Sequence, residues 1–139
     1  MTREQQRLVR DSFDAVRDQA RPLMLLFYGK VFELDPSARR LFHNDIALQG
    51  RKLVDTLDTV TQALDHFDSL RPRLIELGRQ HAGFGVRAEQ YDVITTALLW
   101  ALAQALGPDF DAPTRDAWKS LLAAITSVMK EGALQQQHT

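Results

Sequence analysis

The sequence contains no cysteine among its 139 residues. This absence excludes disulfide bonds, thiolate nucleophiles, cysteine-ligated zinc and iron–sulfur clusters. Glycine (7) and proline (5) are also few, and we find neither an internal repeat nor a low-complexity linker. The composition is 45% hydrophobic and 25% charged, which is typical of a globular domain. We therefore expect a single domain over residues 1–139.

Neither sign of charge is in excess, because the sequence contains 17 Lys and Arg and 18 Asp and Glu, which gives a net charge of −1. A nucleic-acid-binding protein would show a basic excess or stripe, so we expect no nucleic-acid partner. The longest apolar run, Ile94 to Leu106, contains Gln104 and is too short to span a bilayer. The first residues lack the apolar stretch of a signal peptide. We expect a cytoplasmic protein without membrane contact.

The motifs of common enzyme classes are also missing. There is no GxSxG motif, no Walker loop and no HExxH motif. The four histidines, His43, His66, His81 and His138, are far apart and do not follow the spacing of zinc ligands. No conventional catalytic arrangement is therefore predicted from these residues.

Apolar residues recur with the period of an α-helix, and no segment alternates with a period of two. Thr2 and Gln5 have the spacing of a capping box at the start of a first helix. Pro22 suits the opening turn of a second helix. Asp35-Pro36 is expected to end that helix and to begin a short turn through Phe42.

Further along the chain, we expect a long helix over residues 46–66 and another that Gly83 and Gly85 close as left-handed caps. A helix over residues 88–106 is apolar almost all round, as expected of a buried helix. The last helix is expected to begin at Pro113 or Thr114. About seven helices result, and their irregular lengths favour crossed helices over an up-and-down bundle. The predicted fold class is all-α.

Three polar residues interrupt apolar stripes. His81 shares a helix face with Leu74 and Leu77, Gln49 follows Ile46 on the long helix, and Tyr28 lies in an apolar run. Each residue alone has an ordinary structural explanation: a satisfied core histidine, a glutamine at the edge of a stripe, and a core tyrosine whose hydroxyl reaches a carbonyl. Only their combination suggests chemistry.

That combination resembles globins, and in particular bacterial single-domain haemoglobins of the Vitreoscilla and flavohaemoglobin branch, with the greatest similarity to the Hell's Gate type. The resemblance covers essentially the whole chain and implies a three-over-three helical sandwich. The ordered set of Asp35-Pro36, Phe42, Gln49 and His81 is its most specific part. The segments that carry it are residues 26–32, 41–42, 48–53 and 77–86, together with Tyr91 and Trp118.

The resemblance implies a cofactor, haem b, and a role for each matching residue. His81 would be the proximal ligand of the iron, and Phe42 would pack flat against the haem. Tyr28 and Gln49 would be the distal pair, acting on a ligand at the open site. The other residues that would contact the haem are Leu53, Leu77, Val86 and Tyr91.

The physical logic of such a site agrees with these residues. The second nitrogen of His81 needs an acceptor, and the carbonyl of Leu77, four residues earlier, is well placed to provide it. Donors from Tyr28 and Gln49 would stabilise bound dioxygen, which carries partial negative charge. Arg51, Lys52 and Arg79 would either pair with haem propionates or remain solvated.

The implied ligands are O2, NO and CO, and the implied activity is oxidation of nitric oxide to nitrate with an external reductase. The alternatives are a sensor that acts through a protein partner and a haem-free globin-fold interaction module. We expect a monomer or a weak dimer.

One position departs from flavohaemoglobins. Their last helix carries a proximal glutamate at a position that falls on Ala133 here, and Glu131 lies about 200° round the helix from it. We therefore favour oxygen and nitric oxide chemistry over peroxide activation.

Overall fold

The computed structural model describes residues 1–41 and 46–137, and it contains α-helices and 3₁₀ segments but no strand within these ranges. Phe42, to which the sequence assigns a haem contact, and the expected linker at 43–45 lie outside the described residues. The α-helices are α1 (Arg3–Val16), α2 (Ala20–Leu34), α3 (Ile46–Gln62), α4 (Arg71–Gly83), α5 (Ala88–Leu106) and α6 (Ala112–Gln137). The 3₁₀ segments are η1 (Arg17–Gln19), η2 (Pro36–Leu41), η3 (Leu64–Leu70) and η4 (Gly107–Asp109).

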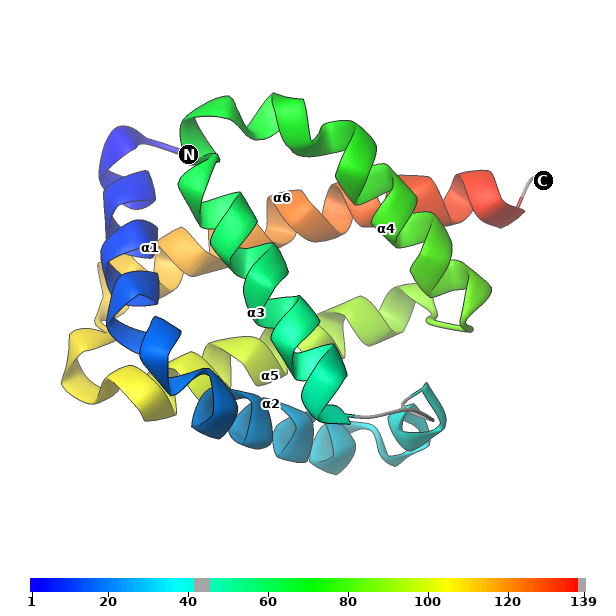
Figure 1. The fold of residues 1–139 in the computed structure, drawn as a ribbon, viewed down its shortest axis with the longest axis horizontal. Coiled ribbons are helices and arrows are strands. Elements are labelled where there is room, and N and C mark those ends of the chain that lie inside the picture. Colours follow the sequence, from blue (N-terminus) through cyan, green and yellow to red (C-terminus); the bar gives the residue numbers. More distant parts are fainter. Residues whose placement is uncertain (42–45, 138–139) are drawn as a thin grey trace.

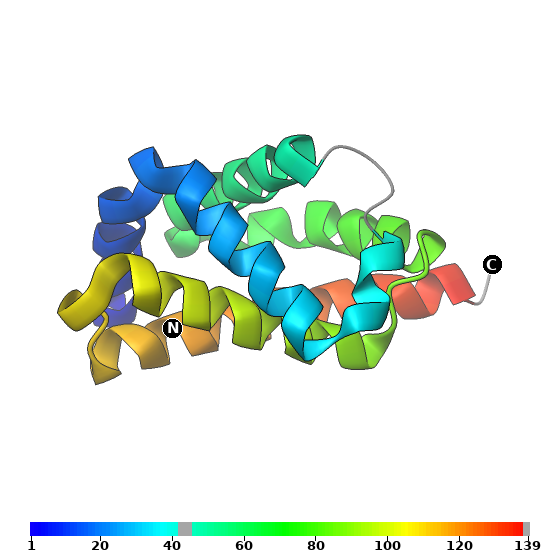
Figure 2. The same cartoon turned by 90° about the horizontal axis from the view of Figure 1, so that it is seen from below.

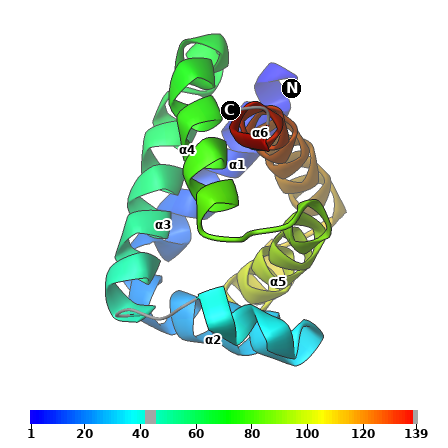
Figure 3. The ribbon, with the colours of Figure 1, turned by 90° about the vertical axis from the view of Figure 1, so that its right-hand side faces the viewer.

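The helices cross one another in two layers. Helices α3 and α4 lie on one side of the molecule and α5 and α6 on the other (Figures 1 and 2). Helix α2 packs against both α3 and α5, and it closes the lower end in the view of Figure 3. Helix α4 packs most extensively against α6. Within the described residues, no helix is both long enough and apolar enough to cross a membrane.

Several predicted helix ends are confirmed. The backbone N–H of Gln5 donates to Thr2 Oγ1 at 3.0 Å, and the N–H of Thr2 donates to Gln5 Oε1 at 3.1 Å, which completes the capping box of α1. Helix α2 ends before Asp35, and η2 follows at once, as expected. Gly107 ends α5 with a φ of 58°, a left-handed conformation that glycine adopts without strain.

The predicted end of the long helix at residue 66 was wrong, because α3 ends at Gln62 and is followed by η3. His66 adopts a non-helical backbone at φ −129° and ψ 38°. Side chains of α1 bind the carbonyls that α3 leaves unpaired there. Arg10 Nε donates to the Thr61 carbonyl at 3.1 Å, and Gln6 Nε2 donates to the Leu64 carbonyl at 3.4 Å.

Two smaller expectations also need correction. Gly83 is the last residue of α4 and has no positive φ, so Gly85 alone, at φ 94°, makes the left-handed turn between α4 and α5. Helix α6 starts at Ala112, before the expected Pro113 or Thr114. Its first turn is capped by Asp111, whose Oδ1 accepts from the Thr114 N–H at 3.0 Å.

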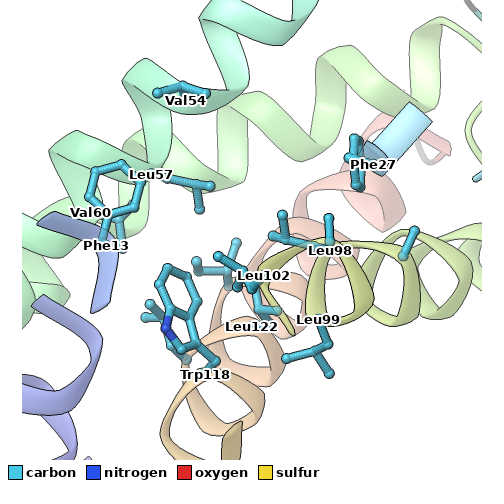
Figure 4. Packing of buried hydrophobic residues seen from close by; sticks show 14 of the residues in the cluster. Phe13, Phe27, Val54, Leu57, Val60, Leu98, Leu99, Leu102, Trp118 and Leu122 are labelled. Carbon is cyan, nitrogen blue, oxygen red and sulfur yellow. The ribbon is translucent and has the colours of Figure 1, made fainter. Parts of the chain in front are cut away.

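The core is centred on Trp118, which is fully buried on α6. Figure 4 shows Leu102 and Leu122 close to the indole, with Phe13 of α1 above it. The rings of Phe13 and Trp118 are 6.4 Å apart. Trp118 Nε1 donates to Ser12 Oγ at 2.8 Å, and that hydroxyl donates to the Leu8 carbonyl at 2.7 Å. This part of the core is therefore both closely packed and fully hydrogen-bonded.

Helices α4 and α6 touch through their backbones. A Cβ atom added to Gly78 would lie 2.0 Å from the Met129 carbonyl oxygen, and one added to Gly132 would lie 2.0 Å from the Ile75 carbonyl oxygen. Both distances are far inside van der Waals contact, so only glycine fits at either position. This reciprocal contact, which we call the glycine crossing, fixes α4 against α6 one turn before His81.

Candidate functional site

His81 lies in the last turn of α4, four residues after Leu77. Its Nδ1 is 2.7 Å from the Leu77 carbonyl oxygen, so the predicted contact is present. Because a carbonyl can only accept a hydrogen bond, Nδ1 carries the hydrogen and Nε2 is left with its lone pair. Burial lowers the pKa of His81, which also favours the neutral imidazole. The lone pair on Nε2 of His81 is therefore available to bind a metal ion.

The turn after α4 is built on the carbonyls of its last residues. The N–H of Val86 donates to the His81 carbonyl at 3.0 Å, and the N–H of Gly85 donates to the Ala82 carbonyl at 3.0 Å. The half-buried Val86 is thereby held beside His81. A Cβ on Gly85 would lie 3.9 Å from Leu41 Cδ2, so η2 reaches the same turn.

Tyr28 is buried in α2, and its ring stacks against that of Phe32 with centroids 6.3 Å apart. Burial raises the pKa of Tyr28 to about 12, so the hydroxyl keeps its proton at neutral pH and can donate a hydrogen bond. A Cβ added to Gly50 of α3 would lie 3.5 Å from Tyr28 Cε2. Gln49 directly precedes Gly50, so its backbone lies where α2 and α3 are in contact.

Helices α3 and α4 face each other across a cavity of about 360 Å³. Thr56 and Val60 line it from α3, and Leu77 and Gln80 line it from α4. Gln49 and the half-buried Leu53 lie seven and three residues before Thr56, which puts them on the same side of α3. Gln49 and Leu53 thus occupy the face of α3 that looks toward the helix of His81.

Tyr91 lies in the first turn of α5 and is 3% exposed. Burial raises its pKa, so its hydroxyl is neutral. Lys130 Nζ of α6 lies 6.0 Å from the centroid of the Tyr91 ring. Glu131 pairs with Arg71 on the surface and does not reach Tyr91. No carboxylate from the described part of α6 is therefore bonded to the Tyr91 hydroxyl.

Three buried side-chain atoms of the described residues have no hydrogen-bond partner, namely Gln49 Oε1, Arg79 Nε and Tyr91 Oη. An unpaired buried polar atom costs about 1–3 kcal/mol, and proteins keep such atoms mainly where something else binds. The resemblance assigns Gln49 and Tyr91 to the surroundings of a haem, and Arg79 was expected either to pair with a haem propionate or to remain solvated. They come from three different helices: α3, α4 and α5.

The structure does not bring every candidate into one contact network. Tyr28 and Gly50 form one group, and Leu77, His81 and Val86 form another. Arg51 and Lys52 are exposed. Among residues 1–41 and 46–137, no group of three or more His, Asp or Glu side chains is arranged to hold a metal ion. A single histidine holds iron firmly when a porphyrin supplies the other ligands.

Sequence reasoning missed the roles of Gly78, Gly132 and Lys130. A glycine inside a helix costs about 1 kcal/mol relative to alanine, so Gly78 and Gly132 did carry a signal of close backbone approach. The contact between Lys130 and Tyr91 joins residues 39 positions apart, and nothing in the local sequence indicates it.

Comparison with known proteins gives one consistent family. The globin family model matches residues 25–129. Among curated proteins, neuroglobin-1 of Oncorhynchus mykiss is 25% identical, over 95% of this chain and 92% of its own length. Neuroglobin of Tetraodon nigroviridis is 27% identical, over 90% of this chain and 87% of its own length.

Two solved structures share the fold. An engineered carbene transferase from Rhodothermus marinus, assigned as a nitric oxide dioxygenase, superimposes with a TM-score of 0.87 at 24% identity, covering 97% of this chain and 94% of its own. A bacterial globin from Campylobacter jejuni has a TM-score of 0.85 at 20% identity, covering 99% and 100%. The predicted all-α globin fold is confirmed, and the chain belongs to the globin family.

Proposed function

We propose that this chain is a haem-containing globin that binds oxygen tightly. The observation that supports it most directly is the state of His81, whose Nδ1 donates to the Leu77 carbonyl while Nε2 keeps its lone pair. Globins bind haem, and the residues of this chain fit that group. The three buried polar atoms without partners are what a binding crevice would leave in the protein. Leu77, whose carbonyl is bonded to His81, also lines the cavity between α3 and α4.

Haem, when bound, supplies an iron that takes up diatomic ligands and changes its oxidation state. His81 would hold that iron through Nε2, and the Leu77 carbonyl would fix the orientation of the imidazole. Leu53, Leu77, Val86 and Tyr91 would line the crevice and exclude water. Phe42, outside the described residues, would complete it.

Tyr28 and Gln49 would act on the ligand at the open site. Because burial raises the pKa of Tyr28 to about 12, its hydroxyl keeps its proton and remains a donor at neutral pH. The amide of Gln49 can donate to the ligand or accept from Tyr28 and orient it. A hydrogen bond to a charged group is worth about 1.5–3 kcal/mol, which is about one to two decades in affinity. Slow release of oxygen is the expected result.

Slow release suits a reaction better than transport, and we propose dioxygenation of nitric oxide. In that reaction one NO, one O2 and one electron give one nitrate ion. The electron must come from an external reductase. This proposal includes membership of the Vitreoscilla and flavohaemoglobin branch, haem b as the cofactor and a chain of one domain.

The first experiment is the visible absorption spectrum of the purified protein, ferric and then reduced with dithionite, with and without CO. We expect a strong Soret band that moves to a sharp CO-bound position. Without such a band, even after adding hemin, the chain would be a haem-free globin-fold module and the proposal would be wrong.

His81→Gly tests the proximal assignment. We expect haem retention to fall at least tenfold and to recover when free imidazole fills the space left by the side chain. His66→Gly is the matched control, because His66 is exposed on η3. An unchanged Soret spectrum in the His81 variant would contradict the assignment.

Tyr28→Phe tests the distal pair. We expect the oxygen dissociation rate to rise about 10- to 100-fold, since one donor to a charged ligand is lost. The dioxygenase proposal is tested separately: the oxygenated protein mixed with NO should become ferric and release one nitrate per NO.

A further inference from the structure

Three helices meet on the proximal side of the candidate site. At the glycine crossing, the backbone of α6 at Met129 and Gly132 touches the backbone of α4 at Ile75 and Gly78. Gly78 is three residues before His81 on α4, and Lys130 follows Met129 on α6. The crossing therefore brings Lys130 to the side of α4 on which His81 is held.

Lys130 is directed to the aromatic ring at the start of α5. Its Nζ lies 6.0 Å from the centroid of the Tyr91 ring, within the range of a cation–π contact. Tyr91 is almost fully buried, at 3% exposure, and Lys130 is half-buried. The ammonium group is therefore kept close to the proximal wall.

The charge of Lys130 is not balanced by a nearby acid among the described residues. The adjacent Glu131 pairs with Arg71 on the surface, and no ion pair joins Lys130 to any carboxylate of residues 1–41 or 46–137. His81 itself is bonded to a neutral carbonyl. Within the described residues, the proximal side thus carries a positive charge that makes no ion pair, and no anion is bonded to the histidine.

A fixed positive charge favours whichever state of a neighbouring group has the lower positive charge. Reduction of a ferric haem removes one positive charge from the iron. We infer that Lys130, held against Tyr91, is a positioning residue that favours the reduced state of the haem bound through His81. This inference rests on the proposed function, and it names the residue that makes reduction by an external electron donor easier.

The test is the midpoint potential of the haem-loaded protein, measured by dye-mediated titration with the Soret band as readout. We expect Lys130→Gln to lower the ratio of reduced to oxidised haem roughly threefold at a fixed potential, as for loss of one partly screened charge. Lys130→Glu should lower the ratio further, and Lys130→Arg should restore the value of the unmodified protein.

Lys119→Gln is the matched control. Lys119 is exposed on the same helix and lies eleven residues before Lys130, about 16 Å along the axis. The Lys119→Gln variant should leave the midpoint potential of the haem unchanged. A Lys119 effect as large as that of Lys130 would show that only net charge matters and would overturn the inference.

The iron–histidine stretching frequency of the reduced protein, measured by resonance Raman spectroscopy, distinguishes a through-space effect of the Lys130 charge from a change in packing. It should stay constant in Lys130→Gln, because the charge acts through space and the His81 bond to Leu77 is intact. A shifted frequency would overturn the inference in favour of a packing role.

A normal Soret band with an unchanged midpoint potential in Lys130→Glu would overturn the inference and leave the proposed function standing. Absence of a Soret band in the unmodified protein would overturn both.

Discussion

The end of the molecule around Trp118 and the end around His81 differ in how their buried polar groups are satisfied. Trp118 Nε1 donates to Ser12, and the Ser12 hydroxyl donates in turn to a carbonyl. Among the residues of the candidate site, by contrast, Gln49 Oε1 of α3, Arg79 Nε of α4 and Tyr91 Oη of α5 are buried without partners in the described protein. The first end consists of contacts that the chain makes with itself, whereas the second leaves groups available to a ligand.

The hydrogen-bonded groups around Trp118 therefore contribute to stability, whereas the unpaired groups of the candidate site are available for function. Closing every buried hydrogen bond lowers the free energy of the folded chain, and leaving some of them open raises it. The contacts of Trp118 with α1 do not involve the three unpaired groups, so we expect that cost to be local. Four pairs of substitutions test this separation, from the largest expected effect to the smallest.

Trp118→Ala should cost about 3–5 kcal/mol in the free energy of unfolding of the haem-free protein, since it removes a fully buried indole. His81→Ala should cost less than about 1.5 kcal/mol, because it removes one hydrogen bond and a half-buried ring. Urea unfolding followed by circular dichroism measures both. Equal losses would mean that the two ends do not divide stability and function as we describe.

Gly78→Ala should destabilise the protein by about 1–3 kcal/mol, because its Cβ would lie 2.0 Å from the Met129 carbonyl oxygen. Gly29→Ala in α2 is the matched control. A Cβ there meets nothing within 4 Å, so helix propensity should make it neutral or stabilising by up to about 1 kcal/mol. If both variants behaved alike in thermal unfolding, the glycine crossing would not be a tight contact.

Gln49→Leu and Ser12→Ala should change stability in opposite directions. Removing the Gln49 amide, whose oxygen is buried without a partner, should stabilise the haem-free protein by about 1 kcal/mol. Removing the Ser12 hydroxyl leaves Trp118 Nε1 without an acceptor and should destabilise it by about 1 kcal/mol or somewhat more. Chemical denaturation resolves the signs, and a loss of stability in Gln49→Leu would show that the glutamine is satisfied.

Asp35 should give the smallest effect, visible only in acid. Bonds from Ser37 and Gln90 hold the pKa of its carboxyl below the usual 3.8. Since the folded-state pKa is lowered, this stabilisation is complete above the unfolded-state pKa and is lost as the pH falls through the folded-state pKa. Asp35→Asn should therefore flatten the stability profile below about pH 4, whereas Asp68→Asn, at an exposed carboxylate, should leave the profile unchanged.

Much of the fold and part of the site could be predicted from local patterns. The capping box of α1, the break at Asp35-Pro36 and the approach of His81 to the Leu77 carbonyl all depend on residues at most four positions apart. The end of α3 could not be predicted, because it depends on Arg10 and Gln6, more than fifty residues away. The contact of Lys130 with Tyr91 was inaccessible for the same reason: it exists only once α5 and α6 have packed.

The glycine crossing also determines which movements are open to α4. Two carbonyl oxygens lie against two Cα positions, and a backbone contact has no side-chain rotamers with which to adjust to sliding. Translation of α4 along α6 would separate both pairs at once, whereas a small tilt about the crossing would keep them together. His81 lies one turn beyond that point, so a change at its imidazole would reach the rest of the protein as a rotation of α4. The turn at Gly85 and Val86 lies farther from the crossing than His81 does, so the displacement caused by such a rotation would be larger there.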